Sequence, residues 1–181
     1  MRYVTFGLAL VTLAAGRLGA QAPAYEKPAP GLDDATIVAI LEQANTAEIE
    51  LAELAAKMGQ STEVRDLGRS FGLAHTQARQ KARDLAVKIG VIPTPPMDNM
   101  MLKTHGASIT KLKELKGAEF DVALVAREIE HHSAMLETVD KKLLPAARNA
   151  ELKALLEELK PSLQAHLDQA RALEKRLALG Q

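Results

Sequence analysis

The chain has 181 residues, of which 23 are basic, 23 are acidic and none is cysteine or tryptophan. Charges of both signs are balanced and interleaved, which excludes the electrostatic attraction that brings basic proteins to nucleic acids or anionic lipids. The lack of cysteine excludes thiolate catalysis, cysteine-based zinc sites and a lipid anchor on cysteine.

The first twenty residues have the pattern of a secretory signal peptide. Met1 and Arg2 form a short positive start, an apolar stretch follows over residues 4–15, and residues 18–20 lead up to the cleavage point. The apolar stretch is shorter than the roughly 20 residues that a membrane-spanning helix needs. We therefore predict that residues 1–20 are removed on export and that the mature chain is periplasmic or secreted, without a transmembrane segment. An uncleaved N-terminal anchor is the alternative.

Residues 21–32 are rich in Pro, Ala and Gly, which predicts a flexible leader. Asp33 or Asp34 then supplies the N-cap of a helix over residues 35–58, which Gly59 ends. Spacings of three and four residues give this helix one apolar face: Ile37, Leu41, Ala44, Leu51, Ala55 and Met58.

A second helix is predicted from a cap at Ser61 or Thr62 to Ile89, where Gly90 stops it. Its apolar face is made by residues at the same spacings: Val64, Phe71, Ala78, Ala82, Leu85 and Ile89.

Residues 91–106 change character, because Pro93, Pro95 and Pro96 oppose a helix and favour an extended path. A short amphipathic helix is predicted next, over residues 108–115. Three methionines in this region are either soft copper ligands or flexible residues that fill gaps in the packing: Met97, Met100 and Met101.

A third long helix is predicted over residues 118–144, and a turn over residues 145–149, Pro145 followed by Ala-Ala-Arg-Asn, separates it from a fourth. The apolar face of the third helix comprises Val125, Ile129, Leu136, Val139 and Leu143. The apolar face of the fourth comprises Leu152, Leu156, Leu159, Leu163, Ala170, Leu173 and Leu177. Pro161 lies inside the fourth helix and is predicted to kink it, since it removes one backbone hydrogen bond.

No segment shows the strict alternation of apolar and polar residues that indicates a strand. Four helices of roughly 25–30 residues span on the order of 40 Å, enough to surround one core. We therefore predict one all-α domain over residues 33–180. Its expected architecture is a ferritin-like four-helix bundle, with the Pro-rich connection and the short extra helix between the second and third helices.

Each apolar face contains one titratable side chain that its spacing directs inward. These side chains are Glu48, His75, His132 and His166, one from each long helix. Counting residues from the turns places Glu48 within about one helical turn of His75, and His132 level with His75. The same count offsets His166 from His132 by about one and a half turns. The pattern therefore predicts a site of two or three members.

Two interpretations of this polar set remain open. The first is a metal site of one carboxylate and two or three imidazoles, a ligand set that suits copper, zinc or iron. The second is a buried hydrogen-bond network between Glu48 and the histidines that fixes the register of the helices. Buried polar groups need partners, and either arrangement supplies them.

The two remaining histidines are predicted to lie at the surface. Glu128 and His131 have the spacing of a solvated pair on one helix, and His105 is expected to be an exposed loop residue. No Ser–His–Asp series, phosphate-binding glycine loop or pair of catalytic carboxylates is evident. The sequence therefore does not predict an enzyme.

Several segments resemble one bacterial family of ferritin-like proteins, catalogued as domain of unknown function 4142. The resemblance lies in residues 47–55, 71–75, 112–121, 132 and 163–167, so it covers essentially the whole mature chain. It implies a four-helix ferritin-like domain in an exported bacterial protein, usually without an assigned activity. The polar positions that recur in the family fall here on Glu48, His75, Asp121, His132 and His166.

The chain also departs from patterns of that family and its wider group. The family often has an acidic residue just before the histidines of the second and third helices, where this chain has Ala74 and His131. Di-iron proteins of the wider ferritin-like group need a Glu-x-x-His pattern on two helices. Gly72 and Leu163 stand where those glutamates would precede His75 and His166, so di-iron chemistry is not expected.

We expect an exported, non-catalytic helical-bundle protein with a role in the envelope or in stress. The alternative is a periplasmic protein that binds one transition metal through the Glu/His cluster in the bundle core. Binding to another protein or to a second copy of the chain stays open in both cases.

Overall fold

The computed structural model of the chain describes residues 31–96 and 100–180, and the side chains of all of these except 100–102. This part of the chain is built from helices, without a strand, so the predicted all-α class is confirmed. The helical elements in chain order are α1 (Asp34–Met58), α2 (Thr62–Ile89), α3 (Met100–Glu114), α4 (Gly117–Thr138), the π-helical turn η1 (Val139–Leu143), α5 (Leu144–Ala146) and α6 (Ala150–Ala178).

Some predictions fall outside the described residues. They are the signal peptide at residues 1–20, nearly all of the leader at residues 21–32, and the thioether groups of Met97, Met100 and Met101. No helix among the described residues is long and apolar enough to cross a membrane.

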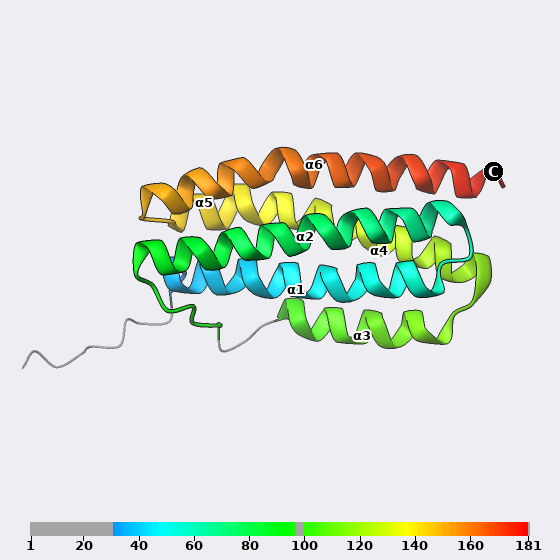
Figure 1. Cartoon of the computed structure of the whole chain (residues 1–181), viewed down its shortest axis with the longest axis horizontal. Coiled ribbons are helices and arrows are strands. Elements are labelled where there is room, and N and C mark those ends of the chain that lie inside the picture. The colour runs from blue at the N-terminus through cyan, green and yellow to red at the C-terminus, as the bar shows by residue number, and fades with distance from the viewer. Residues whose placement is uncertain (1–30, 97–99, 181) are drawn as a thin grey trace, which may run out of the picture.

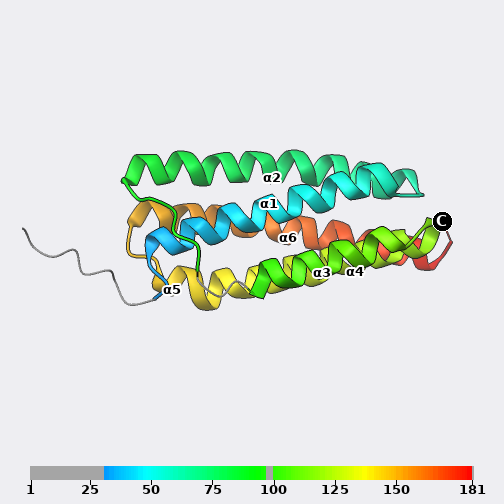
Figure 2. The same ribbon diagram turned by 90° about the horizontal axis from the view of Figure 1, so that it is seen from below.

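The four long helices form two antiparallel hairpins that pack side by side (Figure 1). One hairpin is made by α1 and α2, and the other by α4 and α6. The chain returns from the end of α2 to the start of α4 along the outside of the bundle, and α3 belongs to this return (Figure 2). α3 packs against α1 and α4. The arrangement is a four-helix bundle with one long crossover.

Local capping explains where the long helices begin and end. Asp33 Oδ1 accepts a hydrogen bond from Thr36 N at 2.8 Å, and Ser61 Oγ accepts one from Val64 N at 3.2 Å. Gly90 adopts a φ of +70° after α2, a left-handed conformation that favours glycine. The bounds of α1 and α2 agree with the sequence prediction because these signals are local.

Two aspartates connect the hairpins through caps between different helices. Asp121, near the start of α4, accepts hydrogen bonds from Gln60 N at 2.8 Å and Ser61 N at 2.7 Å. Asp34, at the start of α1, accepts them in the same way from Arg148 N at 2.8 Å and Asn149 N at 3.0 Å. Each carboxylate therefore satisfies backbone donors that precede another helix, and fixes one helix end against the other.

The segment after α2 differs from its prediction. The short helix predicted over residues 108–115 begins earlier, at Met100, so it includes His105. Residues 91–96 are non-helical, as the prolines require, and Thr94 N donates to Ala35 O at 3.2 Å. This contact attaches the beginning of the crossover to the first turn of α1.

The third long helix also differs from its prediction. α4 is regular only to Thr138, and the helical path continues through η1 and α5 to Ala146, past Pro145. Pro145 is tolerated because it occupies the first turn of α5, where its missing N–H is not needed. The chain reverses at residues 147–149. α6 is assigned as one helix through Pro161.

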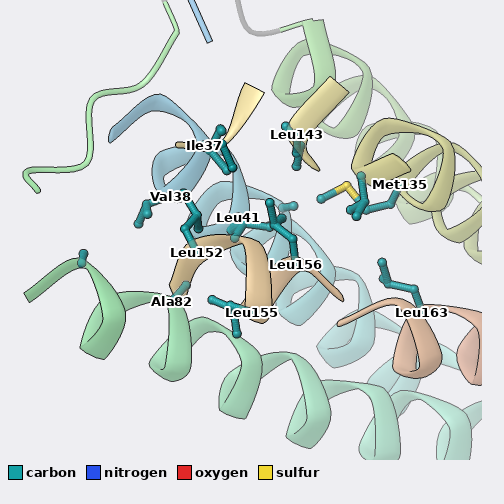
Figure 3. Packing of buried hydrophobic residues seen from close by; sticks show 14 residues of the cluster. Ile37, Val38, Leu41, Ala82, Met135, Leu143, Leu152, Leu155, Leu156 and Leu163 are labelled. Carbon is teal, nitrogen blue, oxygen red and sulfur yellow. The ribbon is translucent and has the colours of Figure 1, made fainter. Parts of the chain in front are cut away.

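Apolar side chains form two core clusters, one toward each end of the bundle. Figure 3 shows the first, in which Ile37 and Leu41 of α1 pack with Leu152 and Leu156 of α6. The second is built around Leu51 of α1 together with Phe71, Phe120 and Leu124. Along each long helix, polar residues between the two clusters are buried. The candidate functional site lies there.

Candidate metal centre

A layer of buried polar side chains separates the two apolar clusters. All four inward residues predicted from the sequence are buried: Glu48, His75, His132 and His166. Three of them come together as an imidazole triad, in which ring nitrogens of His75, His132 and His166 all lie within 4.8 Å of one another. The triad therefore joins α2, α4 and α6.

His132 and His166 are in direct contact. His132 Nε2 lies 3.2 Å from His166 Nδ1, and His132 Nδ1 lies 2.9 Å from the backbone oxygen of Glu128. A carbonyl oxygen only accepts, so His132 carries its proton on Nδ1, and without a metal its Nε2 lone pair accepts the hydrogen bond from His166 Nδ1. Phe71 stacks on the ring of His166 with 4.2 Å between ring centroids, which fixes the plane of that ring.

His75 is oriented by a side chain of α1. Its Nδ1 lies 2.9 Å from Asn45 Oδ1, so Nδ1 donates and Nε2 is left as the free lone pair. Asn45 is itself held, because its amide nitrogen donates to Leu41 O at 2.8 Å. His75 Nε2 is buried and has no hydrogen-bond partner among the described residues. A buried nitrogen with a free lone pair and a fixed ring is a ready ligand.

Burial keeps the three imidazoles uncharged. It lowers the pKa of His75 to about 3 and that of His132 to about 4, and the neighbouring histidines add to the effect at both rings. Burial lowers the pKa of His166 as well. Neutral rings are the form that binds metals, so the triad is in that form at neutral pH.

A pair of carboxyl groups lies next to the triad. Ligand atoms of Glu48, Glu128 and His132 lie within 4.8 Å of one another. Glu48 and Glu128 are each 1% exposed. His131 Nε2 lies 3.2 Å from Glu48 Oε1. The prediction that Glu128 and His131 form a solvated pair is therefore wrong, and the sequence did not reveal that Glu48 and Glu128 lie together.

Burial also changes the protonation of these carboxyl groups. It raises the pKa of Glu48 to about 7. It raises the pKa of Glu128 well above its ordinary value, and the charge of Glu48 beside it acts in the same direction. Burial lowers the pKa of His131 well below its ordinary value. In the absence of a cation, two buried carboxyl groups in contact hold a proton between them.

The remaining predicted residues lie elsewhere. Asp121 caps the turn before α2 and does not join the polar layer. His105 is buried in α3, with Nε2 3.1 Å from Glu50 Oε2, so the expectation of an exposed loop residue is wrong. His105 is buried because α3, which carries it, packs against α1, and the local sequence does not reveal this contact.

The predicted offset of His166 is also wrong, because its ring contacts that of His132. The turn occupies only residues 147–149, the last part of the segment predicted over residues 145–149, so 16 residues separate His132 from Arg148 and 18 separate Arg148 from His166. A difference of two residues is only about 3 Å along a helix.

We expect His75 to make the metal-free protein more sensitive to acid. The unfolded chain protonates this ring below about pH 6.5, and the folded chain only near pH 3, so stability is lost as the pH falls below 6.5. The free energy of unfolding of the wild-type chain, relative to His75→Gln, should fall by about 1.5 kcal/mol between pH 6.5 and 5. Urea unfolding with chelator present measures this difference.

Glu48→Gln tests a pH dependence of stability that is opposite in sign to that of His75. The folded pKa of Glu48 is raised to about 7, so its contribution to stability is present below pH 4.5 and is lost as the pH rises toward 7. Relative to Glu48→Gln, the wild-type chain should lose about 1.5 kcal/mol between pH 5.5 and 7. Parallel stability curves for the wild-type chain and either variant would contradict these assignments.

Comparisons with known proteins agree with this fold. The model of the family described as "Domain of unknown function (DUF4142)" matches residues 19–173. The crystal structure of a DUF305 fragment from Deinococcus radiodurans is similar, with a TM-score of 0.68 and 16% sequence identity over 78% of this chain and 95% of that chain. At this identity the likeness shows the fold alone. No curated protein matches the chain. The resemblance seen in the sequence is confirmed, and the chain belongs to the DUF4142 family.

Proposed function

We propose that this protein binds one transition-metal ion through His75, His132 and His166, and does so outside the cytoplasm. The observation that carries the proposal is the convergence of three ring nitrogens from three helices within 4.8 Å. Export is inferred from the signal-peptide pattern of residues 1–20.

The spacing of the triad suits a small cation. Zinc–nitrogen bonds of about 2.0–2.1 Å at tetrahedral angles place two ligand nitrogens about 3.3 Å apart. The 3.2 Å between His132 Nε2 and His166 Nδ1 matches this separation. The buried Nε2 of His75 has no hydrogen-bond partner among the described residues, so metal binding there would break no existing hydrogen bond. Imidazole ligands favour zinc, copper, nickel and iron over calcium or magnesium.

The surroundings of the triad also suit metal binding. Nδ1 of His75 donates to Asn45 Oδ1, and Nδ1 of His132 donates to the backbone oxygen of Glu128. These two hydrogen bonds orient both rings. A cavity of about 30 Å³ touches His75 and His166, enough for about two water molecules. Three protein ligands and an adjacent cavity of this size leave a coordination position for water or a small exogenous ligand.

The test is a titration of chelator-stripped protein with Zn²⁺, Cu²⁺ and Fe²⁺, followed by calorimetry and thermal melting. One of these ions should bind the triad saturably. Held at about 100 times its dissociation constant, it should add about 2.7 kcal/mol of stability, a rise of roughly 5–10 °C. His75→Gln and His166→Gln should each weaken this binding by at least about 100-fold, because each removes a ligand.

His105→Gln is the matched control, since it removes a buried histidine that is not in the triad. It should leave the affinity of the metal unchanged. If no ion raises the melting temperature, or if His105→Gln weakens binding as much as His75→Gln, the proposal fails. The histidines would then serve as a structural hydrogen-bond network in a non-catalytic bundle.

A further inference from the structure

The carboxyl pair beside the triad is not used by the proposed function. We propose that Glu48, Glu128 and His131 form a second divalent-cation site, which shares no ligand with the triad. It binds harder cations of the manganese or ferrous type, because two carboxylates and one imidazole make up its ligand set. The protein then holds two metal ions per chain in adjacent positions.

The geometry centres on Glu48. Its Oε1 lies 3.2 Å from His131 Nε2, and its carboxylate lies within 4.8 Å of a ligand atom of Glu128. The three side chains come from two helices that face each other across the core, Glu48 from α1 and the other two from α4. Glu128 and His131 are three residues apart on α4, so they share one face of that helix.

Three of the four carboxyl oxygens of this group lack a hydrogen-bond donor, unless the two carboxyl groups share a proton. Both carboxyl oxygens of Glu48 and Oε2 of Glu128 are buried without a hydrogen-bond donor among the described residues. The contact between His131 and Glu48 is short but is not aligned as a hydrogen bond. Unpartnered buried carboxylates are costly, and a cation between them would remove that cost.

No basic side chain among the described residues forms an ion pair that would balance the charges of Glu48 and Glu128. Arg127 acts on both carboxyl groups through its charge, but it makes no ion pair with either of them. A divalent ion would balance the two negative charges, and the neutral His131 would add no further charge. The alternative occupant is a proton shared between Glu48 and Glu128, and the experiment below separates the two.

His132 lies between the two sites without ligating both. Its Nδ1 lies 3.4 Å from Glu128 Oε2, close to both carboxyl groups, but this nitrogen carries the proton that it donates to the backbone oxygen of Glu128 and so has no lone pair for an ion there. Its Nε2 faces the triad. The cavity of about 30 Å³ is lined by Glu48 and His131 as well as by His75 and His166. Water in that cavity can complete the coordination of an ion in either site.

The experiment uses Mn²⁺ as the probe, because carboxylate and water ligands suit this ion better than an all-imidazole site does. Binding to the chelator-stripped full chain is followed by electron paramagnetic resonance and equilibrium dialysis. We expect one Mn²⁺ per chain. Glu48→Gln and Glu128→Gln, which keep the shape of the side chains, should each weaken binding by at least about 100-fold. The matched control Glu119→Gln, at an exposed site of α4, should have no effect.

The double variant His75→Gln/His166→Gln separates the two proposals. It should retain Mn²⁺ while losing the ion bound by the triad. If the wild-type chain binds no Mn²⁺, or binds it equally after Glu48→Gln, the second site is wrong and the carboxyl pair holds a proton. The triad proposal would be unaffected by that result. His131→Gln, which leaves both carboxylates in place, tests the same site if a glutamate variant fails to fold.

Discussion

Gly68→Ala is expected to lower the free energy of unfolding by about 3 kcal/mol or more, because it forces α1 and α2 apart. A Cβ at Gly68 would lie 2.6 Å from Ala52 O, 2.7 Å from Ala55 Cβ and 2.7 Å from Ala56 N. These atoms belong to the backbone of α1 or are attached directly to it, so no change of rotamer relieves the clash. Urea unfolding of the chelator-treated protein measures the loss.

Gly72→Ala is the matched control, one turn further along α2. A Cβ there would lie 3.4 Å from Ala52 Cβ, an ordinary contact. Alanine is favoured over glycine in a helix by up to about 1 kcal/mol, so this variant should be as stable as the wild-type chain or slightly more stable. Equal stability of the two variants would show that the close approach at Gly68 does not hold the hairpin together.

The same hairpin positions part of the metal centre. Asn45 on α1 orients His75 on α2 through a contact of 2.9 Å, which depends on the distance between the two helices. Gly68→Ala should therefore also weaken metal binding by the triad, whereas Gly72→Ala should not. The missing side chain at Gly68 thus serves the site as well as the fold.

Asp121→Ala is expected to cost about 3 kcal/mol of stability without weakening metal binding. The carboxylate accepts from Gln60 N and Ser61 N, and hydrogen bonds to a charged acceptor contribute about 1.5–3 kcal/mol each. Water replaces part of this contribution, because Gln60 is exposed and Ser61 is half-buried. Thermal melting together with Zn²⁺ titration measures both quantities in one preparation.

Glu119→Ala is the control for Asp121→Ala, since it removes the same charge from the first turn of α4 at an exposed position. It should change stability by no more than about 0.5 kcal/mol. A loss of metal affinity in Asp121→Ala at unchanged stability would contradict the capping role. It would instead indicate that Asp121 takes part in metal binding.

Much of the candidate site could be predicted from the sequence, because helix periodicity directs side chains inward without knowledge of the partner helix. Glu48, His75, His132 and His166 follow from this rule, and all four are buried. Glu128 and His131 do not follow from this rule, because two overlapping series of residues, each with spacings of three and four, run along α4. Both series lead to one buried face, and the apolar Ile129 favours the series that omits Glu128.

A usable signal for Glu128 is nevertheless present in the sequence. Leu124, Glu128, His131 and Met135 have spacings of four, three and four, the same spacings as the predicted face. Both series together describe a wider buried face on α4, as expected for a helix in contact with two neighbours. Glu128 and His131 are overlooked when only apolar residues are used to identify the buried face, although a buried polar site requires polar residues on that face.

The sequence by itself determined the all-α class, the bounds of α1 and α2 and the four inward titratable residues, because caps, breakers and periodicity act within one helix. Only the tertiary structure decided which of these side chains meet. The reversal at residues 147–149 brings His166 level with His132. The packing of α1 against α4 pairs Glu48 with Glu128. Such contacts depend on heights and rotations of separate helices, and small offsets in a connection change both.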